Sequence, residues 1–332
     1  MELPRFLQVE PVGQCNLRCR MCPVQFRDAG GPGRVPAFMD FAVFCRLIDQ
    51  FPRLSELHLQ GMGEPLLHPR FFDMVRYAAD KGIRVSANSN LTALSERRAA
   101  ECIASGLHEI SVSLDAASPA GYEAIRVGAR QARVLRNLDR LLQARREAAA
   151  TLPRVRLVAV AMRTNLHELP DLVHLAHGHG VDALFVQHLC HDFDETTLPE
   201  RYRAMRDFVD SQTLAQEDPD RIARYFNEAR DAAARLGVTL RLPAPRPRPH
   251  PRERSGAARC DWPWRGSYVS YAGDAMPCCI VATPDRISFG NMVREGAEQV
   301  WNNDAYRQFR QRLAEGPPPE VCHGCAVYKG TF

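Results

Sequence analysis

Three cysteines lie close together near the N-terminus with the spacing Cys-x3-Cys-x2-Cys. They are Cys15, Cys19 and Cys22, and they follow an apolar, strand-like segment at residues 7–12. Thiolate sulfur is a preferred ligand of iron–sulfur clusters, and three thiolates on one short loop can each bind a different corner of a 4Fe-4S cube. The fourth iron would then be open to a small molecule, like the free position of a catalytic metal site. The alternatives are three free thiols or a structural zinc site, for which this loop offers no histidine as a fourth ligand.

A second group of cysteines lies near the C-terminus, at Cys260, Cys278, Cys322 and Cys325. Residues 263–275 have the pattern of a β-hairpin that turns at Gly273, which would bring Cys260 and Cys278 together. The Cys-x2-Cys turn would supply the other two ligands. Four thiolates fully occupy either a zinc ion or a 4Fe-4S cluster, so the spacing alone leaves both metal centres open. Cys279 adjoins Cys278 and can replace it as a ligand.

Strand-like and helix-like segments alternate over residues 7–240. The predicted strands are 7–12, 56–60, 84–88, 109–114, 155–161 and 183–187, and the predicted helices are 41–50, 69–81, 96–105, 133–150 and 166–179. Six strand–helix units with short connections predict an α/β fold with a parallel sheet and helices outside it. Right-handed crossovers would curl this sheet into a partial (β/α)6 TIM-like barrel, although periodicity alone does not separate a barrel from a doubly wound sheet.

The chain divides into three parts by composition. We expect a barrel domain at 1–240, in which 198–240 form a helical extension and the start of a linker. A Pro/Arg-rich linker follows at 241–259, and a small C-terminal α+β domain occupies 260–332.

Charge and hydropathy exclude several classes of partner. The net charge is only +4, and the single basic cluster is interrupted by prolines, so nucleic acid is not an expected partner. No apolar stretch approaches the roughly 18 residues of a membrane span, and the N-terminus does not have the pattern of a signal peptide. We therefore expect a cytoplasmic protein with no membrane partner, in which cysteines bind metal or react rather than form disulfides.

Glycines and polar residues follow several of the predicted strands, at the end where barrel enzymes place their chemistry. They are the segment Gln60-Gly61-Met62-Gly63-Glu64-Pro65, then Ser113 and Asp115, Arg126 further along, and Asn88, Asn90 and Asn165. Glycines let a backbone approach a ligand closely, and an arginine fork suits a carboxylate. Each feature also has a simpler interpretation on its own, as a turn, a surface ion pair or a helix cap.

The order of these segments resembles that of the radical S-adenosylmethionine (SAM) superfamily over essentially the whole chain. The resemblance implies that Cys15, Cys19 and Cys22 hold a 4Fe-4S cluster whose open iron chelates SAM. One-electron reduction then cleaves SAM to methionine and a 5′-deoxyadenosyl radical, which abstracts hydrogen from a substrate. The implied SAM contacts are Gly61, Met62, Gly63 and Glu64 for the amino group, Ser113 and Arg126 for the carboxylate, Asp115 beside them, and Asn88, Asn90 and Asn165 for the ribose or adenine.

The C-terminal segment resembles the SPASM/Twitch extension of the same superfamily. The resemblance implies that Cys260, Cys278, Cys322 and Cys325 hold an auxiliary 4Fe-4S cluster, which makes two clusters in the chain. No cysteine follows Cys325, so a second auxiliary cluster lacks ligands and the shorter, Twitch-like version fits better. A fully ligated cluster cannot chelate substrate, which points to electron transfer or structural support.

The resemblance favours an oxidoreductase that dehydrogenates a secondary alcohol of an aminocyclitol or sugar in antibiotic or other natural-product biosynthesis. The auxiliary cluster would accept the electron, and a flavodoxin or ferredoxin would supply the reducing electron. One alternative is an epimerase in which a thiol, Cys190 or Cys279, returns hydrogen to the substrate radical. Another is a peptide-modifying maturase, which is less expected because the barrel begins at once, with no peptide-recognition domain before it.

Overall fold

The computed structural model describes residues 1–26, 37–189, 198–245, 260–281, 283–323 and 325–329. In this part of the chain the strands form one nine-stranded sheet, in the order β7-β6-β5-β4-β3-β2-β1-β8-β9. The strands are β1 (Phe6–Val9), β2 (Glu56–Leu59), β3 (Arg84–Ser89), β4 (Glu109–Ser113), β5 (Arg154–Ala161), β6 (Ala183–His188), β7 (Leu240–Arg241), β8 (Gly266–Val269) and β9 (Ala275–Met276). All neighbours from β7 to β8 are parallel, and β9 runs antiparallel to β8.

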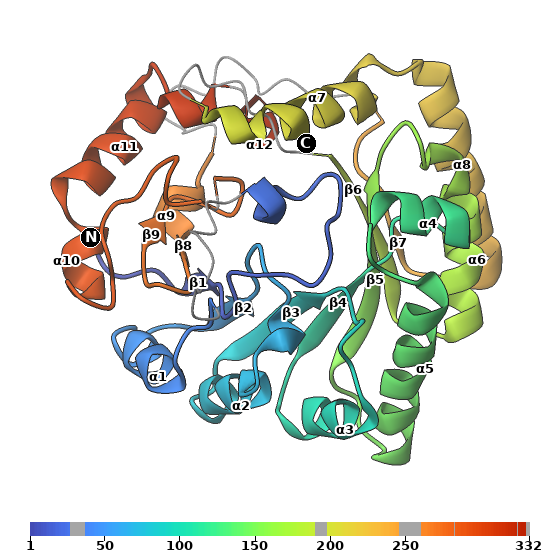
Figure 1. Ribbon diagram of the computed structural model, residues 1–332, viewed down its shortest axis with the longest axis horizontal. Coiled ribbons are helices and arrows are strands. Elements are labelled where there is room, and N and C mark those ends of the chain that lie inside the picture. Colours follow the sequence, from blue (N-terminus) through green and yellow to red (C-terminus); the bar gives the residue numbers. More distant parts are fainter. Residues whose placement is uncertain (27–36, 190–197, 246–259, 282, 324, 330–332) are drawn as a thin grey trace.

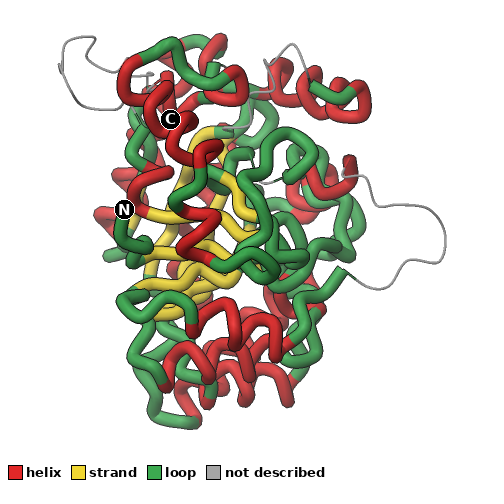
Figure 2. The backbone as a smooth tube through the Cα atoms, turned by 90° about the vertical axis from the view of Figure 1, so that its left-hand side faces the viewer, coloured by secondary structure: helices red, strands yellow, loops and turns green. Residues whose placement is uncertain are grey.

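Helices cover the outer, convex face of this curved sheet (Figure 1). The helices are α1 (Phe41–Asp49), α2 (Phe71–Asp80), α3 (Glu96–Ala104), α4 (Pro119–Ile125), α5 (Gln131–Glu147), α6 (Leu169–His179), α7 (Arg203–Gln212), α8 (Pro219–Leu236), α9 (Trp262–Arg265), α10 (Ala297–Trp301), α11 (Asp304–Glu315) and α12 (Ala326–Lys329). The strands lie together at the centre of the molecule when it is turned through 90° (Figure 2). All six predicted strands are present, and the predicted partial α/β barrel is confirmed.

The residue pattern of these elements explains the layering. Every second residue of β5 is buried, and the apolar side chains Val134, Leu138 and Leu141 form a fully buried stripe on α5. Alternation in a strand and a 3.6-residue stripe in a helix are the patterns with which helices cover a sheet. Side-chain caps fix where several helices begin, for example Asp40 at α1 and Ser95 at α3.

The C-terminal segment joins the barrel sheet, which the sequence does not predict. β8 pairs in parallel with β1, from Phe6 opposite Gly266 to Val9 opposite Val269. The N-terminus lies beside α10 (Figure 1), where the Trp301 indole N–H donates to the carbonyl of Glu2 at 2.9 Å. An open barrel leaves the backbone groups of an edge strand unpaired, and β8 satisfies those of β1. The two cysteine groups are therefore attached to the same sheet.

No helix in the described residues is both long enough and apolar enough to cross a membrane.

Candidate active site

A cavity of about 190 Å³ lies at the carboxyl ends of the barrel strands, between the first cysteine loop and the segments after β2, β3, β4 and β6. The sequence-predicted residues that line it are Cys15, Cys19, Cys22, Gly61, Met62, Gly63, Glu64, Asn88, Asn90, Ser113 and Arg126. The fold therefore brings together residues that come from five separate parts of the chain. Asp115 and Asn165 are not part of this lining, and Cys190 lies outside the described residues.

The first cysteine loop is held by the backbone that follows α4. The amide of Arg18 donates to the carbonyl of Val127 at 2.9 Å, and that of Arg20 donates to Ile125 at 3.1 Å. At the far end of the loop, the Gln25 amide donates to the carbonyl of Cys19 at 3.0 Å. These contacts fix the loop with its cysteines against the cavity.

The three thiols are poor acids in this environment. Burial raises the pKa of Cys15 to about 11 and that of Cys22 to about 12, and it raises the pKa of Cys19 as well. Arg126 opposes the effect at Cys19, because its Nη1 lies 3.8 Å from the sulfur. A metal binds the thiolate form, so binding at this loop must release protons.

The glycine segment after β2 packs directly on the backbone of the cysteine loop. A Cβ atom on Gly63 would collide with the carbonyl of Val12 and come within 2.5 Å of that of Gln14. The amide of Glu64 then donates to the Gln14 carbonyl at 3.0 Å. The nearest neighbours of this glycine are thus protein atoms, and its role in the fold is to bring two site segments together.

Glu64 places a buried carboxylate at the cavity. Its oxygens accept hydrogen bonds from the Ser89 hydroxyl and the Asn90 amide, each at 2.7 Å, and from the Leu66 amide at 3.0 Å. Burial raises the pKa of Glu64, whereas these three bonds act in the opposite direction. A fixed acceptor of this kind is suited to an ammonium group.

Arg126 is oriented by Asp115. Its Nε donates to Asp115 at 2.6 Å, and the other carboxylate oxygen of Asp115 accepts the amide of Val160 at 2.9 Å. The aspartate is fully buried and the arginine is 12% exposed, so the guanidinium is the member of the pair that reaches the cavity. The structure gives Asp115 the role of holding this arginine, with no cavity-facing surface of its own.

The side-chain amide of Asn165 forms hydrogen bonds with backbone groups at both of its ends. Its Nδ2 donates to the carbonyls of Asp115 (2.6 Å) and Val160 (2.9 Å), and its Oδ1 accepts the amide of Met162 (2.7 Å). The structure therefore does not bring this predicted cofactor contact to the cavity, because both ends of its amide hold the turn after β5.

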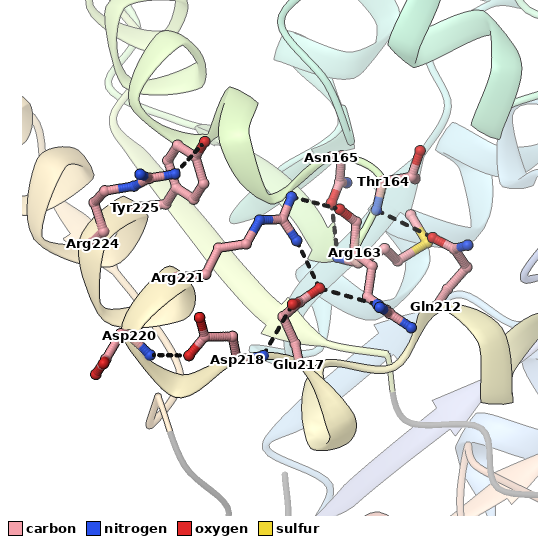
Figure 3. Close-up of polar contacts among 11 residues, drawn as sticks. Arg163, Thr164, Asn165, Gln212, Glu217, Asp218, Asp220, Arg221, Arg224 and Tyr225 are labelled. Atoms are coloured by element: carbon pink, nitrogen blue, oxygen red, sulfur yellow. Dashed lines mark hydrogen bonds and ion pairs between the residues drawn. The ribbon is translucent and has the colours of Figure 1, made fainter.

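The same turn is fastened to the helices beside it. Figure 3 shows Arg163 and Arg221 converging on Glu217, with Arg163 Nε at 3.0 Å and Arg221 Nη1 at 2.6 Å. The amide of Thr164 donates to Gln212, the last residue of α7, at 3.2 Å. These contacts tie the end of β5 to α7 and to the start of α8.

Two further residues contribute to the site: Glu10, which the sequence did not single out, and His188, which follows the sixth predicted strand. Glu10, directly after β1, accepts the amide of Met62 at 2.9 Å and that of Tyr271 at 3.4 Å, so it links the glycine segment to the C-terminal domain. His188, at the end of β6, lines the cavity and contacts the carbonyl of Ala244 at 2.9 Å. Burial lowers the pKa of His188, which favours its neutral form. A charged or polar residue at a strand end was the only sequence signal for either.

The C-terminal cysteines of the described residues interact electrostatically with one another. Besides burial, the neighbouring thiols Cys279, Cys325 and Cys260 raise the pKa of Cys278, and Cys278, Cys325 and Cys260 raise that of Cys322. Burial raises the pKa of Cys260 to about 11. The four thiols are thus close enough to interact electrostatically.

A four-thiol group can hold either a zinc ion or a four-iron cluster. Zinc holds its sulfur ligands at about 2.3 Å, whereas a four-iron cube gives each thiolate its own iron and so separates the ligands further. Cys279, next to Cys278, also packs against Tyr268 and Met276, as Met62 does.

Comparison with known proteins gives the following matches. Residues 9–176 match the radical SAM superfamily, and residues 260–326 match SPASM, an iron–sulfur cluster-binding domain. A tungsten-containing aldehyde ferredoxin oxidoreductase cofactor-modifying protein of Pyrococcus furiosus is 26% identical over 324 residues, 92% of this chain and 83% of that protein. A PqqA peptide cyclase of Xanthomonas euvesicatoria is 27% identical over 331 residues, 97% of this chain and 80% of that protein.

A similar fold is found in Streptococcus suis SuiB, whose crystal structure was determined with the precursor peptide SuiA. The TM-score is 0.70 at 13% sequence identity, and the alignment covers 99% of this chain and 71% of SuiB. At this identity the likeness shows the fold alone.

Proposed function

Because the chain belongs to the radical SAM superfamily and carries a SPASM domain, we propose that it is a peptide-modifying enzyme that removes hydrogen from a residue of a peptide. The radical SAM domain binds a 4Fe-4S cluster and SAM, and the SPASM domain binds additional iron–sulfur. The observation that supports the peptide substrate is the PqqA peptide cyclase match, which spans 97% of this chain. Dehydrogenation of an aminocyclitol or sugar, the reaction favoured by the sequence, finds no support among the curated relatives described above.

The chemistry that SAM and the cluster supply when bound is reductive cleavage to a 5′-deoxyadenosyl radical. The residues that line the cavity fit a 4Fe-4S cluster and SAM. Three thiols face one cavity, the Arg126 guanidinium provides a positive charge 3.8 Å from Cys19, and the Glu64 carboxylate faces the same space. We assign Cys15, Cys19 and Cys22 to the cluster, Glu64 to the SAM ammonium group, and Arg126, oriented by Asp115, to the SAM carboxylate.

Other residues position these groups or limit the cavity. Asn90 Nδ2 donates to the Asn16 side chain at 3.1 Å and lies 3.7 Å from the sulfur of Cys15, so it supports the start of the cysteine loop. Ser113 and Asn88 line the cavity, and we assign them to the SAM carboxylate and ribose. For the auxiliary cluster we assign Cys260, Cys278, Cys322 and Cys325, because Cys322 interacts electrostatically with the other three thiols.

The test uses anaerobically reconstituted enzyme with SAM and dithionite. Peptides encoded by short reading frames that flank its gene are incubated with it, together with a panel of aminocyclitols and sugar alcohols. We expect 5′-deoxyadenosine, and a peptide that has lost hydrogen atoms at one residue by mass spectrometry. The Cys15→Ala/Cys19→Ala/Cys22→Ala variant should form neither. Ketone formation from a polyol, with every peptide unchanged, would overturn the peptide assignment and restore the dehydrogenase.

A further inference from the structure

The first cysteine loop has two faces. Leu17, Cys19 and Met21 are buried and line the SAM cavity, whereas Arg18 and Arg20, which alternate with them, are exposed. The backbone hydrogen bonds of Arg18 to Val127 and of Arg20 to Ile125 maintain this alternation. A single layer of polypeptide therefore separates the cluster-binding side of the loop from the outside of the protein.

A hollow of about 320 Å³ lies on the outer face of this layer. Arg18 and Arg20 line it together with Phe26, Val127 and Phe208, the last from α7. Val127 is 44% exposed, which is unusual for an apolar side chain in this protein. The guanidinium of Arg20 stacks over the Phe208 ring at 5.1 Å. The hollow thus combines two cations with an apolar floor.

No carboxylate among the described residues neutralises the positive charge of the hollow. Within the described residues, neither Arg18 nor Arg20 is in an ion pair, and no carboxylate lines the hollow. Neighbouring arginines behave differently, since Arg126 pairs with Asp115 and Arg130 with Glu123. Two unpaired guanidiniums beside an apolar floor match a partner that presents carboxylates around an apolar centre.

We propose that this surface, named here the Arg18–Arg20 face, is the docking site of an acidic one-electron carrier protein of the flavodoxin type. The inference rests on the proposed function, which requires the Cys15/Cys19/Cys22 cluster to be reduced. In the step, the reduced carrier loses one electron and the cluster gains it, and no bond or proton is transferred. Electron transfer slows steeply with distance, so a donor is most effective where only one layer of loop covers the cluster.

The size and charge of the face suit an encounter of this type. Electron-transfer complexes bury little surface and dissociate readily, so charge steering rather than contact area sets their rate. Steering of this kind raises association rates by about 10 to 1,000-fold and weakens as ionic strength increases.

The test compares two reductants on the reconstituted holoenzyme. Bleaching of the cluster absorbance is followed after mixing with reduced flavodoxin or with dithionite, a small molecule that needs no docking site. We expect the double variant Arg18→Glu/Arg20→Glu to be reduced at least about tenfold more slowly by flavodoxin at low ionic strength, and to lose most of the salt dependence. Its reduction by dithionite, and SAM cleavage driven by dithionite, should stay as in the wild type.

A matched control reverses the same amount of charge elsewhere. Arg133→Glu/Arg136→Glu changes two exposed arginines on α5, and it should leave the flavodoxin rate unchanged. Val127→Glu adds a negative charge to the hollow without altering the cysteine loop. It should slow cluster reduction by flavodoxin and leave reduction by dithionite unchanged.

Three outcomes would overturn the proposal. They are an unchanged flavodoxin rate in the Val127→Glu variant, equal slowing with both reductants, and a control as slow as the Arg18→Glu/Arg20→Glu variant. If the face binds the peptide substrate instead, its substitution would raise the KM for peptide with dithionite as reductant while the flavodoxin rate stays normal. Loss of peptide modification in the wild type, with normal cluster reduction, would refute the proposed function and leave the docking site standing.

Discussion

At the scale of single residues, adjacent or similar side chains have different roles in this site. Cys278 interacts electrostatically with Cys279, Cys325 and Cys260 and raises the pKa of Cys322, while Cys279 also packs on Tyr268 and Met276. The sequence offers the two thiols as interchangeable ligands. The structure distinguishes them by packing, since Cys279 lies against the Tyr268 and Met276 side chains.

Iron content distinguishes the two thiols. We expect the Cys278→Ser variant to lose the auxiliary cluster, so that iron per chain falls by about four, the content of one cubane cluster. The Cys279→Ser variant should keep its full iron content, and the signal of the first cluster should persist in both. Equal loss of iron from the two variants would show that either thiol can complete the site.

At the scale of elements, the structure depends on turns that fasten strand ends. Asn165 fixes the turn after β5 through three backbone contacts, and Arg163, Glu217 and Arg221 tie that turn to α8 (Figure 3). Buried backbone groups that lose such partners cost about 1–3 kcal/mol each.

We therefore expect the Asn165→Ala variant to be destabilised by about 2–4 kcal/mol, because it leaves the Asp115 and Val160 carbonyls without this donor. Denaturant unfolding of the apoprotein measures the loss. SAM affinity of the folded, reconstituted variant should remain within about threefold of the wild type. A large fall in SAM affinity with unchanged stability would instead make Asn165 a direct cofactor contact.

Sequence patterns predict which helices and strands form better than they predict which strands pair or what a polar side chain contacts. The strands were recognisable because apolar residues alternate, as in β5, and the cluster ligands because thiols at fixed spacing have few other uses. The pairing of β8 with β1 was not predictable, since the buried pattern of β8 gives no information on which strand lies beside it. Asn165 and Asp115 were assigned to the cofactor because a polar residue at a strand end serves equally well as ligand or as support.

At the scale of the whole molecule, the stability of the barrel depends on pH through a histidine inside the sheet. His58 of β2 contacts the Ser86 hydroxyl at 2.8 Å, and burial lowers its pKa from 6.5 to about 4. Between these two values the unfolded chain binds the proton and the folded chain does not. Stability from this group is therefore complete above pH 6.5 and is lost as the pH falls towards 4.

The loss should be about 2 kcal/mol, because each pKa unit is worth about 1.4 kcal/mol and the ring is only partly shielded. Chemical unfolding at a series of pH values measures it. A His58→Asn variant should show a shallower decline between pH 6.5 and 4 than the wild type. Parallel curves for the two proteins would mean that other groups control the acid transition.

Because β1 and β8 pair within one continuous sheet, the positions of both cysteine groups depend on this pairing. A Cβ atom on Gly266 would lie 2.5 Å from the Phe6 ring and 3.0 Å from the Phe6 carbonyl, so Gly266→Ala must separate the two strands. We expect it to lower the free energy of unfolding by about 1–3 kcal/mol and to weaken iron retention at both cysteine groups together.

Gly178→Ala is the matched control, because Gly178 lies within α6 with no atom near the added methyl. It should stabilise the protein by about 0.5–1 kcal/mol and leave iron content unchanged. If Gly266→Ala loosened the C-terminal cluster alone, β8 would be an accessory strand and the barrel would keep β1 in place without it.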